Sequence, residues 1–126
     1  MIPRYRAWDN WRERMSVVDR IYIDTKGVRL YDDFGEYWRD FNDVKLMQST
    51  GLFDKNGKEI FEKDIVDFKG RKAIVKWHES YASFIYEFVD ELQNRTTEWQ
   101  PLYLSYYHFE IIGNSFENPE LLEVTE

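Results

Sequence analysis

Two histidines are the side chains in this sequence best suited to acid–base chemistry. His78 and His108 are its only imidazoles, and Glu79 follows His78 directly. A carboxylate beside an imidazole could take part in general acid–base catalysis if both groups were held near a substrate. The histidines are 30 positions apart and the chain has no cysteine, so the short His and Cys spacing of a zinc site is absent. We therefore favour a structural position for His78 at the end of a strand.

The segment 54–59, Asp-Lys-Asn-Gly-Lys-Glu, carries oxygen ligands that resemble the start of a calcium loop. In the EF-hand pattern a bidentate glutamate lies six positions after the glycine. The residue six positions after Gly57 is Lys63, so the pattern is incomplete. The dipeptide Asn56-Gly57 instead favours the two positive φ angles of a type I′ turn. We predict that the chain reverses at Asn56 and Gly57.

A basic hairpin is the strongest local structure that the sequence predicts. Two runs rich in β-branched residues, 64–68 and 71–77, flank the dipeptide Lys69-Gly70, which we interpret as a second turn. Cations on such a hairpin could contact nucleic-acid phosphates while bases stack on aromatic rings. The candidate contacts are Lys69, Arg71, Lys72 and Lys76. The competing interpretation is an ordinary solvated face, because Trp77 alternates in register with Ala73 and Val75 and is expected in the core, with Ile74 half covered.

Composition places the chain among globular proteins and narrows its chemistry. Its 126 residues are 43% hydrophobic and 18% aromatic, enough to bury one core. The absence of cysteine excludes thiol chemistry, and the N-terminal residues show neither a signal core nor a membrane-spanning run, so we expect a cytoplasmic protein with no membrane contact. The net charge is −7, and residues 81–126 contain only one base against nine acids. This acidity either aids solubility or allows the protein to imitate DNA toward a host protein.

The pattern of apolar residues predicts mainly β structure. Alternation and turn residues predict strands within 5–11, 14–23, 28–31, 44–48, 64–68, 71–77, 83–89 and 104–112, with turns at 26–27 and 69–70. The first of these strands form an N-terminal β-meander. Between 32 and 42, aromatic residues at three- and four-residue spacing predict one or two helical turns. Residues 94–97 are expected in a loop, Pro101 at an edge, and Asn118 as the N-cap of a short helical turn that begins at Pro119.

Three motifs in order resemble the YopX family of phage and prophage proteins. They are Tyr5-Arg6-Ala7-Trp8-Asp9, then Met47 to Leu52 with Asp54 to Ile60, then Ile112-Gly113-Asn114 with Glu117 to Leu122. The resemblance implies a mainly β protein whose later portion is an SH3-like small barrel, encoded by a bacteriophage or prophage. It implies no particular activity. Where the family often has glycine in the motif at 62–66, this chain has Lys63, which argues against a positive φ there, and Ser49 replaces a residue that is often aromatic.

These observations predict a single domain over residues 1–126, with an N-terminal β part at 1–50 and the SH3-like barrel and C-terminal turn at 51–126. We expect a non-enzymatic protein of the host cytoplasm that requires no cofactor. It would bind itself as a homo-oligomer, or bind a host or phage protein. The alternatives are a nucleic-acid-binding small barrel that uses the basic hairpin and an acidic mimic of DNA.

Overall fold

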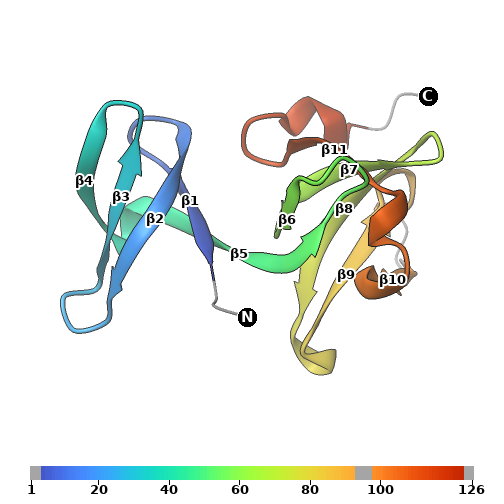
Figure 1. The fold of residues 1–126 in the computed structure, drawn as a ribbon, viewed down its shortest axis with the longest axis horizontal. Coiled ribbons are helices and arrows are strands. Elements are labelled where there is room, and N and C mark those ends of the chain that lie inside the picture. The colour runs from blue at the N-terminus through green and yellow to red at the C-terminus, as the bar shows by residue number, and fades with distance from the viewer. Residues whose placement is uncertain (1–3, 93–97, 124–126) are drawn as a thin grey trace. The chain divides into compact units, whose positions relative to one another are not determined.

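A computed structural model describes residues 4–92 and 98–123 of the chain, and these form two compact units, Met1–Ser49 and Thr50–Glu126 (Figure 1). The described residues contain eleven β-strands, short 3-10 helices and no α-helix, which confirms the mainly β prediction. The division into two units leaves the single-domain assignment a prediction. The loop predicted at 94–97 lies outside the described residues.

The first unit is an antiparallel meander. Its strands are β1 (Tyr5–Asp9), β2 (Arg14–Tyr22), β3 (Gly27–Asp32), β4 (Gly35–Asp40) and the first part of β5 (Val44–Phe53). The sheet order is β4-β3-β2-β1-β5-β6, so each of β1 to β4 pairs with its neighbour in sequence, as the predicted meander requires. Valine and leucine alternate with arginine along β3, and this places Val28 and Leu30 in a core with Ala7 and Val44.

The helical prediction for residues 32–42 is wrong over most of its length. β4 pairs with β3 from Asp32 opposite Gly35 to Gly27 opposite Asp40, and only η1 (Phe41–Asp43) is a 3-10 helix. Gly35 has a φ of 118°, which suits the tight turn between the two strands. Aromatic residues fit a pleated surface as well as a helix face, so the available partner strand decides the conformation.

The second unit contains an open five-stranded sheet. Its strands are β7 (Asp64–Phe68), β8 (Arg71–His78), β9 (Ser83–Phe88), β10 (Trp99–Pro101) and β11 (Glu110–Asn114), in the order β10-β9-β8-β7-β11, and the short β6 (Glu59–Phe61) belongs to the other sheet. The described strands do not close into a barrel, so this part of the prediction is not confirmed. Pro101 lies on the edge strand β10 as predicted, where a residue without an N–H group is tolerated.

The core of the second unit is aromatic and aliphatic. Its fully or nearly fully buried members are Ile60, Val66, Ala73, Val75, Tyr86, Leu102 and Phe109. Trp77, which was predicted to belong to this core, is 41% exposed and meets Phe84 edge-on at the end of the β8–β9 ladder. The last buried residue of β8 is Val75, two residues before Trp77. Ile74 is 3% exposed rather than half covered, because both faces of the sheet are covered at this point.

The two predicted turns differ in geometry. Lys69 and Gly70 both have positive φ, 52° and 88°, and connect Phe68 directly to Arg71, which is a type I′ turn. At the other turn Gly57 has a φ of 82° but Asn56 does not have positive φ, so type I′ is wrong there. Gly57 N–H donates to the Asp54 carbonyl at 3.0 Å and Asp54 N–H to the Lys58 carbonyl at 2.8 Å, the pattern of a type I turn followed by a bulge glycine.

Short 3-10 helices lie between the strands of the second unit and after its last strand. They are η2 (Glu79–Tyr81), η3 (Val89–Glu91), η4 (Leu102–Leu104), η5 (Tyr106–His108) and η6 (Pro119–Leu122). The strand predicted within 104–112 therefore begins only at Glu110. Asn118 does not cap η6 with its side chain; its Oδ1 accepts the N–H of Asn114 at 3.2 Å instead. The longest described helix has four residues, so no described helix could cross a membrane.

Lys63 corrects the expectation drawn from its replacement of glycine. Its φ is 70°, a left-handed conformation that costs an L-residue free energy. Two backbone hydrogen bonds hold it, from Lys63 N–H to the Val75 carbonyl at 2.8 Å and from Ser115 N–H to the Lys63 carbonyl at 3.0 Å. The backbone conformation is therefore the one that glycine would favour, although the side chain is lysine.

Candidate interaction surface

The cations proposed to contact nucleic acid are partly neutralised by carboxylates. Arg71 lies 2.8 Å from Asp90 and 3.1 Å from Glu91, and Lys76 lies 3.1 Å from Glu87. The hydrogen bond to Asp90 raises the pKa of Arg71, and the same bond lowers the pKa of Asp90. Lys72 stands opposite Asp67 in the β7–β8 register. Lys69 lies over the Phe68 ring at 5.4 Å. Three of the four cations on this hairpin, Arg71, Lys72 and Lys76, therefore have an acidic neighbour.

The two histidines pack against aromatic rings in separate places. His78 lies 4.8 Å from the Tyr81 ring and 5.0 Å from the Trp99 ring, measured between centroids. His108 lies 4.2 Å from the Tyr107 ring. In the described residues neither imidazole is hydrogen-bonded to a carboxylate, so the His78–Glu79 pair considered above is not formed.

Asp54, which begins the calcium-like segment, is directed toward backbone N–H groups. Its Oδ1 accepts from Asn56 and Lys58 at 2.9 and 2.8 Å, and its Oδ2 accepts from Ile111 at 3.0 Å. These bonds hold the turn and attach it to β11. In residues 4–92 and 98–123, no three His, Asp or Glu side chains converge as metal ligands would.

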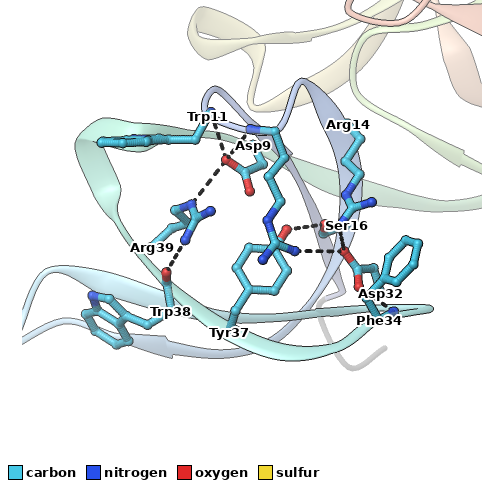
Figure 2. Close-up of polar contacts among 10 residues, drawn as sticks. Asp9, Trp11, Arg14, Ser16, Asp32, Phe34, Tyr37, Trp38 and Arg39 are labelled. Atoms are coloured by element: carbon cyan, nitrogen blue, oxygen red, sulfur yellow. Dashed lines mark hydrogen bonds and ion pairs between the residues drawn. The ribbon is translucent and has the colours of Figure 1, made fainter.

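A cluster of arginines, carboxylates and aromatic rings lies at one end of the first unit (Figure 2). The turns β1–β2 and β3–β4 lie at the same end of the meander, because consecutive strands run in opposite directions. The sheet also curls, since Arg39 of β4 reaches Asp9 of β1 with Nε to Oδ1 at 3.2 Å.

Asp9 is the buried centre of this cluster. Its side chain is fully buried, and Oδ1 accepts the N–H groups of Trp11 at 2.9 Å and Arg12 at 3.3 Å as well as Arg39 Nε. Burial acts to raise the pKa of Asp9, but these two backbone donors, with Tyr37 and Arg39, outweigh it, so the pKa lies below its ordinary value of 3.8. Asp9 therefore stays ionised and fixes the β1–β2 turn.

Tyr37 fills the space between two guanidinium groups. Arg12 lies 4.2 Å and Arg39 lies 4.8 Å from the centre of its ring, within the range of cation–π attraction. The Tyr37 hydroxyl is 2.6 Å from Ser16 Oγ. Burial raises the pKa of Tyr37, with a further contribution from the nearby Asp9 carboxylate. A tyrosine held in its neutral form supports packing here and is a poor proton acceptor.

Asp32 connects the two turns. Its Oδ2 lies 2.8 Å from Arg14 Nη2 and 3.6 Å from Arg12 Nη1, and its Oδ1 accepts the N–H of Phe34 at 2.8 Å. Arg14 also stacks over the Phe34 ring at 4.8 Å. The β1–β2 and β3–β4 turns are thus joined to each other by these ion pairs.

Two aromatic side chains project from this end into solvent. Trp11 is 73% and Phe34 is 82% exposed, and Figure 2 shows them on opposite sides of the polar cluster. Their backbones are held by Asp9 and Asp32, respectively, through the N–H groups already described. We call Trp11, Arg12, Arg14 and Phe34 the arginine–aromatic end. It offers apolar contact area and guanidinium groups on a fixed backbone, which is the chemistry of a binding surface.

Sequence reasoning did not identify this surface. Phe34 was placed on a helix with Tyr37, whereas the structure separates the two on a turn and a strand. The available signal was the excess of arginine near the N-terminus, where residues 1–20 contain five arginines. Locating the surface also requires the pairing of β1 with β2 and of β3 with β4, because this pairing brings the two turns to one end.

The fold and this surface define a two-unit, mainly β protein with exposed aromatic rings beside arginines at one end of its first unit. The sequence matches the YopX protein family over residues 4–123, and the chain belongs to this family. Among solved structures it resembles protein EF1440 from Enterococcus faecalis, with 28% sequence identity and a TM-score of 0.63 over 98% of this chain and 99% of that one. The comparison with curated proteins found no match.

Proposed function

We propose that this YopX-family chain is a non-enzymatic protein-interaction module of phage or prophage origin that binds a partner protein through the arginine–aromatic end. The observation that carries the proposal is the exposure of Trp11 and Phe34 on backbones fixed by Asp9 and Asp32. Tryptophan and arginine are the residues that contribute most often to the energy of protein interfaces. A rigid backbone reduces the entropy that such rings lose on binding.

We further propose that the second unit is an SH3-like small barrel that serves as a scaffold. β7 is the first strand of its five-stranded sheet in sequence and β11 the last, and β7 pairs with both β8 and β11. The 3-10 helices η4 and η5 precede β11. This strand order is that of a small barrel of the SH3 type, and such folds serve many functions, so the site must decide the activity. Its exposed side chains include Tyr81, Tyr103, Leu104 and Tyr107.

Partner capture with matched variants tests the proposal. The double variant Trp11→Ser with Phe34→Ser should reduce recovery of cross-linked partners from infected cells at least about tenfold, as expected for two interface anchors. Ile23→Ser is the control, because Ile23 is 77% exposed in the β2–β3 turn at the other end of the meander. Equal recovery of partners by the double variant and the wild-type chain would refute the proposal. It would also be refuted if the wild-type chain captured no protein and were a monomer by light scattering.

The acidic second unit favours one other candidate function. Residues 1–49 contain nine bases and nine acids, whereas residues 50–126 contain eight bases and fifteen acids and therefore hold the entire net charge of −7. A concentrated negative charge could occupy the DNA-binding surface of a host protein. In that case captured proteins would be released by added duplex DNA, and the Trp11 and Phe34 substitutions would leave capture unchanged.

Nucleic-acid binding by the basic hairpin has its own test. Anisotropy of labelled single- and double-stranded DNA and RNA, measured at low salt, should show binding that Lys72→Gln weakens and that falls steeply as salt is raised. Absence of binding at low salt would exclude this function for Lys69, Arg71, Lys72 and Lys76.

A further inference from the structure

We propose that Asn56 is a site of covalent modification by deamidation, and that the turn built on Asp54 keeps this reaction slow while the chain is folded. The co-reactant is water, and the product is aspartate or isoaspartate in place of Asn56. The site belongs to the second unit and goes beyond the interaction function proposed for the arginine–aromatic end.

The sequence and the exposure of this turn supply the reacting groups. Asparagine is among the thermolabile residues of proteins, and Asn56 is the only asparagine of this sequence that precedes a glycine. Glycine has no side chain to obstruct the approach of its own nitrogen to the preceding side chain. Asn56 and Gly57 are both exposed, and a Cβ added to Gly57 would meet no atom within 4 Å beyond its chain neighbours. Water and hydroxide therefore reach this peptide bond.

Deamidation of this dipeptide passes through a cyclic imide. The Gly57 nitrogen loses its proton to solvent base and attacks Cγ of Asn56, a new C–N bond forms, and the side-chain amide leaves as ammonia after taking a proton from water. Water then adds to one of the two ring carbonyl carbons and the ring opens. Opening on one side gives aspartate, and opening on the other gives isoaspartate, in which the backbone runs through the former side chain.

The folded turn holds the attacking nitrogen away from its target. Gly57 N–H donates to the Asp54 carbonyl at 3.0 Å. Asn56 is the third residue of this type I turn, where ψ is about 0°, so ring closure requires a rotation about its Cα–C bond that directs the Gly57 nitrogen away from Asp54. Asp54 Oδ1 opposes this rotation, because it accepts the N–H groups on either side, from Asn56 at 2.9 Å and Lys58 at 2.8 Å. The turn must therefore open before the ring can close.

The products are poorly suited to the closed turn. Isoaspartate adds one carbon to the backbone between Asp54 and Lys58, which are joined by a backbone hydrogen bond of 2.8 Å. Either product also places a second carboxylate close to Asp54, and like charges repel. The same turn is attached to Phe109 through Lys55 N–H at 2.9 Å and to Ile111 through Asp54 Oδ2 at 3.0 Å. Modification should therefore also weaken the attachment of β11.

The test incubates the full chain at mildly alkaline pH, either folded or unfolded in guanidinium chloride, and follows Asn56 by peptide mass spectrometry with chromatographic separation of isoaspartate. Asn56 should react at least about tenfold more slowly in the folded chain, because at least one backbone hydrogen bond must break first. Asp54→Ala should accelerate the reaction of the folded chain about threefold or more. Val66→Ala is the matched control, because it removes core volume from the same unit and leaves every hydrogen bond of the turn in place, and it should change the rate by less than about twofold. Asn56→Gln should abolish the mass change at this position.

Contrary results overturn separate parts of the proposal. Equal rates in the folded and unfolded wild-type chain would show that the turn gives no protection, and no reaction in the unfolded chain would show that Asn56 is not a site. An unchanged rate in Asp54→Ala, folded by circular dichroism, would exclude control by this carboxylate, as would an equal acceleration in Val66→Ala. If Asp54→Ala does not fold, it should react as fast as the unfolded wild-type chain, and a slower reaction would count against the proposal. The purified isoaspartate form should unfold at lower denaturant concentration, and an unchanged midpoint would refute the effect on β11.

Discussion

Replacement of Asp9 is the most direct test of how the first unit holds its exposed turns. In Asp9→Ala, the N–H groups of Trp11 and Arg12 lose their acceptor and Arg39 loses its carboxylate. Each backbone bond is worth about 1 kcal/mol and the charged bond about 2 kcal/mol, so the free energy of unfolding should fall by about 4 kcal/mol. Asp9→Asn keeps an oxygen for the two backbone donors, and its loss should be about 2 kcal/mol.

The pH dependence of the unfolding free energy separates the contribution of the Asp9 charge from that of the shape of its side chain. The pKa of Asp9 is lower in the folded protein than its ordinary value of 3.8. Its ionisation therefore stabilises the fold at pH values above the unfolded pKa, and this contribution is lost as the pH falls through the lowered, folded-state pKa. The stability difference between the wild-type protein and Asp9→Asn should thus be complete at pH 7 and shrink below about pH 4.

Urea unfolding followed by circular dichroism, at several pH values, measures these differences. Asp19→Asn is the control, because Asp19 is exposed and pairs with the adjacent, exposed Arg20 at 3.4 Å. It should change stability by less than about 0.5 kcal/mol. The reasoning fails if Asp9→Asn is as stable as the wild-type protein at pH 7, or if its deficit persists unchanged in acid.

Three further substitutions test other parts of the fold by the same unfolding measurement. In Gly27→Ala the new Cβ would lie 2.0 Å from the Trp38 ring, so stability should fall by about 2 kcal/mol, and Trp38→Ala in the same chain should remove most of this penalty; additive losses would contradict the steric reason. Lys63→Gly should raise stability by up to about 1 kcal/mol because φ is 70°, and a loss there would count against the left-handed conformation. Asp54→Ala removes three acceptor bonds and should cost about 3 kcal/mol; a loss below about 1 kcal/mol would show that other contacts hold the turn and β11.

The sequence predicted correctly those elements in which the local residue pattern and the partner strand favour the same conformation. The hairpin around Lys69 and Gly70 is the clearest case, because β-branched runs, a two-residue turn and pairing with each other all favour the same structure. The segment 32–42 failed for the opposite reason: its aromatic spacing suits a helix, but β3 supplies an unfilled edge with which it pairs. Trp77 alternates with buried residues as a core residue would, but it lies beyond the end of the core. The local sequence pattern does not indicate where the core ends.

Side-chain hydrogen bonds account for most of the remaining differences. Asp54 accepts two N–H groups within its own turn, which selects a type I turn with a bulge over the type I′ turn that Asn56-Gly57 favours. Asn118 was assigned to cap a helix and instead accepts the N–H of Asn114. The arginine–aromatic end depends on Asp9 and Asp32, whose charged partners Arg39 and Arg14 come from other strands and could not be assigned before the strand order was known.

The pairing of β11 with β7 has a consequence for the kinetics of folding. Val66 stands opposite Ile111, 45 positions later in the chain, whereas Phe68 stands opposite Arg71, only three positions later. Closing a long loop is entropically costlier than closing a short turn, so the β7–β8–β9 hairpins should form before the folding barrier is crossed and β11 should dock after it. Ile111→Ala should therefore accelerate unfolding with little effect on the folding rate, and Ala73→Gly should slow folding. The C-terminal strand would then be the first part of this sheet to detach under force or denaturant.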